Sequence, residues 1–132
     1  MANYTGRVSE LRYGRSGGLE GLVACPPIAI PPAGRYLSAH APAEADAPLA
    51  TPLFLSRVTS TGFWAAPPFP PDWIPGTELI LRGPLGTGFE LHPFVTRLAL
   101  ATLSDSPARL LPLALAALER DCAVTLFSDS LL

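Results

Sequence analysis

Residues 78–89 read ELILRGPLGTGF, and this stretch joins two parts of the chain that differ in their sequence patterns. Its first five residues follow a turn signal at Gly76-Thr77, which predicts a β-strand over residues 78–82. The three glycines in residues 83–89 allow the backbone to turn tightly and to approach a neighbouring group closely. We therefore expect a strand followed by a glycine-rich loop. That loop either lies against a ligand or forms a structural turn between two domains.

The chain before this loop is predicted to consist of short strands. Sixteen prolines among 132 residues argue against a helical bundle, because proline breaks helices and is poorly tolerated inside central strands. The hydrophobic fraction of 48% is too high for a disordered segment. A turn at residues 16–18 and a surface loop over residues 42–50 separate apolar runs. These runs predict strands over residues 5–13, 19–25, 35–41, 53–59 and 62–66.

The chain after the loop has a different pattern. Residues 97–103 (RLALATL) and 123–127 (AVTLF) are apolar runs of the kind found in strands buried on both faces. Polar residues before Pro107 supply helix-start chemistry, so a helix is expected through Arg120. A start at residues 108–111 avoids the hydrogen bond that Pro112 would cost inside a helix. The predicted fold is mainly β with a small α/β appendage: a six-stranded antiparallel barrel followed by one βαβ unit with parallel strands.

This order of a barrel and an α/β unit, with GPLGTGF between them, resembles the ferredoxin-reductase superfamily. The loop most closely resembles that of the electron-transfer subunit of dihydroorotate dehydrogenase. Residues 6–8 (GRV), 34–37 (GRYL) and 111–116 (LPLALA) are also similar to that family. The likeness extends over most of the chain, and the loop is its distinctive part.

The resemblance implies a flavin-binding Greek-key barrel in residues 1–93 and a truncated remnant of a nucleotide-binding domain in residues 94–132. It implies FAD as the cofactor of an electron-transfer protein or subunit that acts with a partner oxidoreductase. The fourth strand and the glycine-rich loop would line the flavin site. The residues concerned are Thr51, Pro52, Leu53, Phe54, Gly83, Pro84, Leu85, Gly86, Gly88 and Phe89.

The fourth strand departs from the family's pattern. The family holds FAD with an Arg-x-Tyr/Phe-Ser motif, whereas this chain has Ala50 or Thr51 at the arginine position and Phe54 at the serine position. A charged hydrogen bond contributes about 1.5–3 kcal/mol, so we expect FAD binding to be weakened. Arg35, on the neighbouring strand, is a candidate replacement. Arg57 becomes one only if the strand register shifts.

The expected nucleotide loop departs as well. The family's Gly-Gly-Gly-x-Gly lets the backbone touch a pyrophosphate, but residues 103–109 (LSDSPAR) contain no glycine and place Asp105 where a phosphate would lie. NAD is therefore not expected. An iron–sulfur cluster or another metal site is not expected either, because Cys25 and Cys122 are far apart in sequence and form no Cys/His cluster.

No catalytic residue is predicted, and whether the chain catalyses a reaction stays open at this level. Two histidines are present, His40 and His92, and a lone histidine is usually a surface or satisfied residue. A hydrolase built on Asp105, Ser106 and His92 has little support, because helix capping explains the first two residues.

The charge and hydropathy of the chain indicate which kinds of partner it can bind. The net charge is −2 and no basic stripe is present, which argues against nucleic acid as a partner. The longest apolar stretch, residues 110–118, is too short to span a bilayer, and no signal pattern precedes it, so we expect a cytoplasmic protein. Charged residues make up 15% of the chain, against about a quarter in typical domains, so a partner protein or a second copy is expected to cover apolar surface.

An aromatic cluster leaves a second function open. Phe63, Trp64, Phe69 and Trp73 lie in or near the PPFPP segment and form either core or a partner-facing patch. With the low charge, this cluster supports an alternative function. The chain would then be a non-catalytic structural or assembly subunit that kept the fold and lost the FAD and NAD sites.

Overall fold

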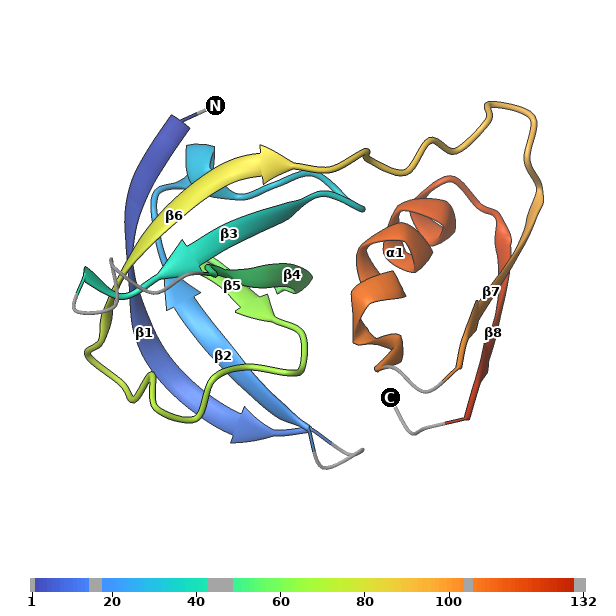
Figure 1. The fold of residues 1–132 in the computed structure, drawn as a ribbon. Helices are drawn as coiled ribbons and strands as arrows, with labels where there is room; N and C mark the ends of the chain where they lie inside the picture. Colours follow the sequence, from blue (N-terminus) through green and yellow to red (C-terminus); the bar gives the residue numbers. More distant parts are fainter. Residues whose placement is uncertain (1, 15–17, 43–48, 104–105, 130–132) are drawn as a thin grey trace.

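The first part of the chain forms a closed barrel. The computed structural model describes residues 2–14, 18–42, 49–103 and 106–129. Six antiparallel strands are arranged in the order β1-β2-β5-β4-β3-β6 (Figure 1). Their bounds are β1 Ala2–Tyr13, β2 Leu19–Ala24, β3 Tyr36–His40, β4 Thr51–Val58, β5 Gly62–Ala65 and β6 Glu78–Leu85. Because β3, β4 and β5 are successive neighbours and β6 returns beside β3, the barrel is a Greek key. The predicted fold class is confirmed.

Alternating side chains of the six strands fill the barrel. Every strand contributes apolar residues at alternate positions or at a single central position, as the two-residue period of a strand requires. Five of the largest are less than 2% exposed: Leu37, Leu53, Phe63, Leu79 and Leu81. A core of this kind explains why the apolar pattern alone predicted the barrel.

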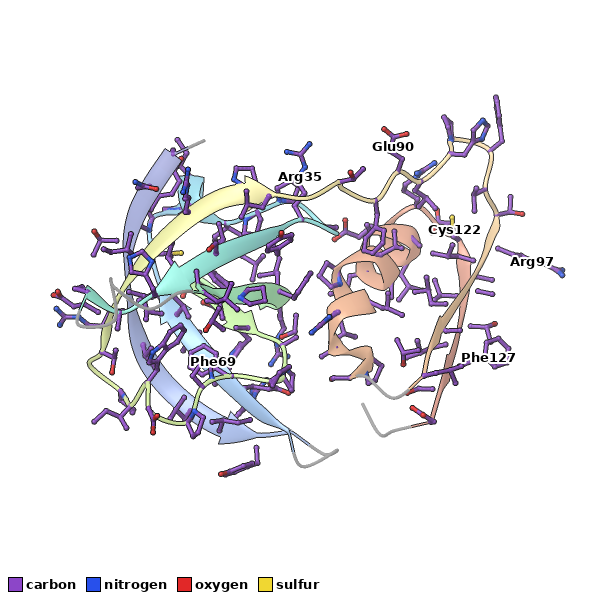
Figure 2. The ribbon with its side chains drawn as sticks, in the orientation of Figure 1. Arg35, Phe69, Glu90, Arg97, Cys122 and Phe127 are labelled. Atoms are coloured by element: carbon purple, nitrogen blue, oxygen red, sulfur yellow. The ribbon has the colours of Figure 1, made fainter. Side chains whose placement is uncertain are left out.

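The aromatic cluster belongs to this core. Phe69 is 3% exposed and Trp73 is 4% exposed, and their ring centroids lie 5.6 Å apart in an edge-to-face arrangement. Figure 2 shows Phe69 directed into the barrel. Gly21 leaves room for it, since an added Cβ would lie 2.4 Å from the Phe69 ring. Of the two alternatives, core is therefore the correct one, and the cluster is not a partner-facing patch.

The second part of the chain is a small α/β unit, here called the appendage. Its elements are β7 Arg97–Thr102, η3 Pro107–Leu110, α1 Leu111–Glu119 and β8 Ala123–Ser128. β7 and β8 pair in parallel, so the predicted βαβ arrangement is confirmed. Pro112 removes no helical hydrogen bond, because it lies in the first turn of α1. This helix begins at Leu111, directly after a 3-10 turn.

The strands of the appendage are not buried on both faces, and this prediction was wrong. α1 covers one face, where Leu100 is 8% exposed. On the other face Arg97 and Phe127 project away from α1 (Figure 2), and Phe127 is 59% exposed. An apolar run indicates only that its strand has small and apolar side chains. It does not indicate whether a second layer of structure covers them.

Residues 86–96 connect the two parts and are held at the end of α1. Arg120 donates hydrogen bonds to the carbonyl oxygens of Leu91 and His92, at 2.9 and 3.1 Å. The thiol of Cys122 donates to the Val95 carbonyl at 3.0 Å. Among the described residues, no helix is long and apolar enough to cross a membrane. Of the predicted turn at 16–18 and loop at 42–50, residues 15–17 and 43–48 lie outside the described part.

Candidate functional site

The barrel meets the appendage along β4. Both η3 and α1 pack on this strand, and two cavities that share Leu55 lie at the junction. The first cavity has a volume of about 200 Å³ and the second about 420 Å³. Residues lining the first cavity are Gly34, Arg35, Phe54, Leu55, Phe89, Thr102, Ser106, Arg109 and Leu110. The second lies between residues 31–33, residues 55–58 and the exposed side of α1.

A β-bulge decides which side chains of β4 face the appendage. The pairing with β5 shifts register between Leu55 and Arg57. At the bulge Ser56 is buried, and its hydroxyl donates to the Trp64 carbonyl at 3.1 Å. Beyond it Arg57 is exposed and lines the second cavity. The shift of the whole strand that Arg57 was expected to require is not seen, because β4 pairs with β3 in a regular register, and the bulge changes only the pairing with β5.

Phe54 forms the aromatic wall of the first cavity. Its ring centroid lies 5.1 Å from that of Tyr36 on β3. The guanidinium carbon of Arg109 lies 4.2 Å from the Phe54 centroid, a cation–π contact between the appendage and the barrel. A planar ligand that stacks on that face of Phe54 has to displace Arg109.

A close contact between two loops brings Arg35 and Phe89 to the same cavity. The Phe89 N–H donates to the Ala33 carbonyl at 3.0 Å. Gly34 makes this approach feasible, because its φ of +85° suits glycine and an added Cβ would lie 2.7 Å from the Phe89 nitrogen. The turn before β3 and the end of the glycine-rich stretch are thereby fixed against each other.

The glycines of the predicted flavin loop face protein atoms. An added Cβ would lie 2.8 Å from Leu37 at Gly83, 3.1 Å from the Tyr36 ring at Gly86 and 3.3 Å from the Ala33 carbonyl at Gly88. The three glycines are therefore explained by close packing against β3 and the turn before it, where a larger side chain would not fit. Gly83, Pro84 and Leu85 also belong to β6, so the loop is shorter than predicted.

The predicted site residues fall into two groups. Phe54 and Phe89 line the first cavity. The other residues predicted on β4 do not line either cavity: Leu53 is 1% exposed in the barrel core, and Thr51 and Pro52 pair with Ala39 and Ser38 on β3.

The segment that replaces the nucleotide loop is capped by the chain itself. The Ser106 hydroxyl accepts a hydrogen bond from the Ala108 N–H at 3.2 Å. Asp105 lies outside the described residues, so the capping role predicted for it and the Asp105–Ser106–His92 group are not described. The His92 ring nitrogen Nδ1 accepts from the Phe94 N–H at 3.2 Å. Within the described ranges, no three His, Cys, Asp or Glu side chains are grouped as a metal site requires.

Arg109 is the functional candidate that the sequence did not reveal. It lies within the helix predicted from residue 107, and no role was predicted for it. One feature of the sequence could have pointed to it: Arg109 is a cation within residues 103–109, the segment expected to correspond to the family's phosphate-binding loop. The first cavity is thus lined by Phe54 and Phe89 and by two arginines, of which Arg109 has its guanidinium over the Phe54 ring. That combination favours binding an anionic, planar ligand over acid–base catalysis.

Thiol chemistry is not favoured in the barrel. Burial raises the pKa of the Cys25 thiol, which lowers its thiolate fraction at neutral pH. Cys25 lines neither of the two cavities at the junction.

Comparison with known proteins gives matches in structure only. No protein-family model matches the sequence, and no curated protein matches it at a significant level. The ferredoxin reductase of carbazole 1,9a-dioxygenase, in its FAD apo form, has a TM-score of 0.71 at 19% identity. An Amycolatopsis cytochrome P450 reductase has a TM-score of 0.74 at 19% identity. Each match covers 96% of this chain and 43% of the reductase.

A third structure is phthalate dioxygenase reductase, described as a modular structure for electron transfer from pyridine nucleotides to [2Fe-2S]. It has a TM-score of 0.67 at 13% identity, and the match covers 95% of this chain and 43% of that one. The chain therefore spans less than half the length of the reductases that it matches. At these identities the matches establish the fold alone, which this chain shares with part of each of these reductases.

Proposed function

We propose that this chain is a ferredoxin-reductase-like electron-transfer module that binds FAD along β4 and exchanges electrons with a partner oxidoreductase in the cytoplasm. The first cavity carries the proposal, because Phe54, Phe89, Arg35 and Arg109 gather there on a fold shared with reductases. The GPLGTGF loop supports a nearer relation to the electron-transfer subunit of dihydroorotate dehydrogenase. In this proposal residues 1–93 are the flavin barrel and residues 94–132 correspond to the start of a nucleotide-binding domain.

The residues that line the two cavities are of the chemical types that bind a flavin nucleotide. Phe89 offers stacking surface for a planar ring, and Phe54 offers its own face once Arg109 is displaced from it. Guanidinium groups offer paired donors for phosphate oxygens. The first cavity alone is smaller than the roughly 300–1,000 Å³ usual for a small-molecule site. The second cavity continues along β4 past Leu55 and adds Arg57, so the two together offer room for a ligand of two parts. A bound flavin would supply electron-carrying chemistry, while Phe54 and Phe89 would orient it and exclude water.

A flavin titration tests the proposal. FAD is added to the purified full chain, and quenching of flavin fluorescence is followed at low salt. We expect saturable binding that the Phe54→Ala variant weakens by up to about tenfold, because a lost aromatic pair costs roughly 0.5–1.5 kcal/mol. Phe94→Ala is the matched control, since Phe94 is 85% exposed and lines neither cavity. Binding that is absent at high micromolar FAD would remove the basis of the proposal.

The second candidate function is that of a non-catalytic assembly subunit. The observation that favours it is the uncovered face of the β7–β8 sheet, where Phe127 is 59% exposed; Leu103, which directly follows β7, is 81% exposed. Parallel sheets are usually covered on both faces, so a partner or second copy is expected there. Light scattering on the eluting protein separates the two cases. A stable oligomer that Phe127→Asp dissociates, together with no flavin binding, would favour assembly.

A further inference from the structure

The open face of the β7–β8 sheet has an uneven distribution of side chains along its length. Residues two apart on a strand share a face, and so do paired residues of neighbouring strands. Arg97 and Phe127 project away from α1 (Figure 2), so the register of the two strands assigns the other positions. Six exposed side chains form this face: Arg97, Ala99 and Ala101 on β7, and Ala123, Thr125 and Phe127 on β8. Small residues therefore lie between one arginine and one aromatic ring.

The two ends of this face differ in charge. Arg97 pairs with Ala123 at the start of both strands, whereas Phe127 pairs with Ala101 near their other end. Four residues along a strand correspond to about 13 Å. Asp129 directly follows β8, so it lies at the Phe127 end, where it also takes part in an interaction within its own chain. One end of the face is thus positive, and the other is aromatic with an acidic residue next to it.

A second copy turned by 180° presents the same face in the reverse order. With the twofold axis across the strands, Arg97 of each copy meets the Phe127 end of the other, where a cation is attracted by an aromatic ring and by an opposite charge. An axis along the strands would instead place the two Arg97 side chains at the same end. Small central side chains allow two sheets to pack face to face. The face is therefore complementary to itself, as a twofold interface requires.

The size of the face limits the strength of such a contact. Two strands of six residues form a face about 20 Å long and about 10 Å wide, so two copies would bury roughly 400 Å² in total. Standard interfaces bury about 1,200–2,000 Å², and those much smaller are weak or transient. We therefore expect a dimer that forms reversibly and only at high protein concentration.

We infer that two copies of this chain associate weakly through the open faces of their β7–β8 sheets, with the strands of one copy antiparallel to those of the other. The inference does not rest on flavin binding, and it commits the uncovered face to one occupant, a second copy. Both cavities lie where η3 and α1 pack on β4, on the covered side of the sheet, so the dimer leaves them accessible.

Sedimentation equilibrium of the purified full chain tests the contact. We expect the average mass to rise from monomer towards dimer as the concentration increases from about 10 µM to about 1 mM. Phe127→Asp places a charge in the contact and should raise the dissociation constant by at least about tenfold. Tyr13→Asp is the matched control, because Tyr13 is 74% exposed on β1 of the barrel, and it should associate as the wild type does. Circular dichroism checks that each variant keeps the fold.

Reversing the charges tests the orientation of the two copies. Arg97→Glu and Asp129→Arg should each raise the dissociation constant by about threefold or more, because like charges then meet across the interface. Combined in one chain, the two substitutions restore opposite charges and should return the dissociation constant to within about threefold of the wild-type value. Positions 97 and 129 lie at opposite ends of the face in one chain, so a recovery of dimerisation has to arise between copies.

Three results would overturn the inference. They are a chain that stays monomeric up to about 1 mM, a dimer that Phe127→Asp leaves intact, and a double variant that associates no better than Arg97→Glu alone.

An FAD titration separates this inference from the proposed function. Phe127 lines neither cavity, so Phe127→Asp should bind FAD as the wild type does. If the wild type binds FAD and stays monomeric, the inference alone fails. If it dimerises with the expected dependence on Phe127 and binds no FAD, the proposed function alone fails.

Discussion

The barrel and the appendage bury their apolar side chains in different ways. Within the barrel, six strands close on one another and enclose a core in which Phe63, Leu37 and Leu79 are fully buried. In the appendage, two parallel strands and one nine-residue helix cover only one face of the sheet. Leu100, Leu113 and Ala117 are its buried strand and helix residues, and Phe127 lies on the open side.

This difference indicates that the barrel stabilises itself, whereas the appendage depends on β4. A closed barrel has no free sheet edge, so its hydrogen bonds and its core reinforce each other. A two-stranded sheet is at best marginally stable alone and needs packing against something else. Here that packing is provided by α1 and by the contact of η3 and α1 with β4. The candidate site lies in this contact, so the weaker half of the molecule also supplies one of its walls.

The largest effect is expected from Phe63→Ala in the barrel. Removing a fully buried phenylalanine leaves a cavity and costs about 3–5 kcal/mol. Urea denaturation followed by tryptophan fluorescence should show the loss as a lower midpoint of the main transition, since Trp64 and Trp73 both lie in the barrel. Phe94→Ala, at a side chain that is 85% exposed, should change stability by less than about 0.5 kcal/mol. Equal effects of the two variants would contradict the placement of the core.

A smaller and more local effect is expected from Leu100→Ala in the appendage. Its side chain is 8% exposed on the covered face of the β7–β8 sheet, so truncation should cost about 2–4 kcal/mol. Amide hydrogen exchange should show faster exchange in β7 and β8 while β1 and β2 keep their protection. Leu103→Ala is the control, because Leu103 is 81% exposed. Uniform loss of protection across both halves would show that they unfold as one unit. It would contradict the difference in stability between the barrel and the appendage.

The sequence predicted the barrel well because its signals are local. Turns containing glycine or proline separate many of the strands. Buried pairs two residues apart, such as Leu37 and Ala39 or Leu79 and Leu81, show the period that a one-sided strand requires. The helix start near Leu111 was predictable for the same reason, since Pro112 is tolerated only in a first turn.

The open face of the appendage and the site were less predictable because they depend on contacts distant in sequence. The alanines and leucines of β7 form the same sequence pattern whether or not another layer of structure covers them. Arg109 reaches Phe54 only because the appendage folds back on β4, and nothing near residue 109 encodes that contact. The bulge that turns Arg57 outward is a property of the β4–β5 pairing and not of either strand alone.

Gly34→Ala tests the contact that joins the two halves of the site. The positive φ at Gly34 disfavours alanine, and an added Cβ would lie 2.7 Å from the Phe89 nitrogen. We expect a loss of about 1–2 kcal/mol in unfolding free energy and a reduced affinity for FAD, because Phe89 lines the first cavity. Gly76→Ala is an informative control, because Gly76 also has a positive φ but an added Cβ would meet nothing within 4 Å. Gly76→Ala should lose stability and keep its affinity for FAD. A Gly34→Ala variant with unchanged affinity for FAD would contradict the role of this contact in holding Phe89 at the cavity.

The smallest effect concerns the one cysteine in each half. Burial raises the pKa of Cys25, so in a Cys122→Ser variant its alkylation should reach half-maximal rate at a higher pH than a free cysteine peptide measured alongside. Because the folded pKa lies above the unfolded one, the stabilising contribution of the protonated thiol is present below the unfolded pKa and is lost as the pH rises through the folded pKa. In the reciprocal Cys25→Ser variant, Cys122 is 4% exposed and reacts only when the appendage opens. Its labelling rate should therefore rise at urea concentrations that leave the barrel folded. A Cys122 that becomes reactive only with global unfolding would show that the appendage is as stable as the barrel.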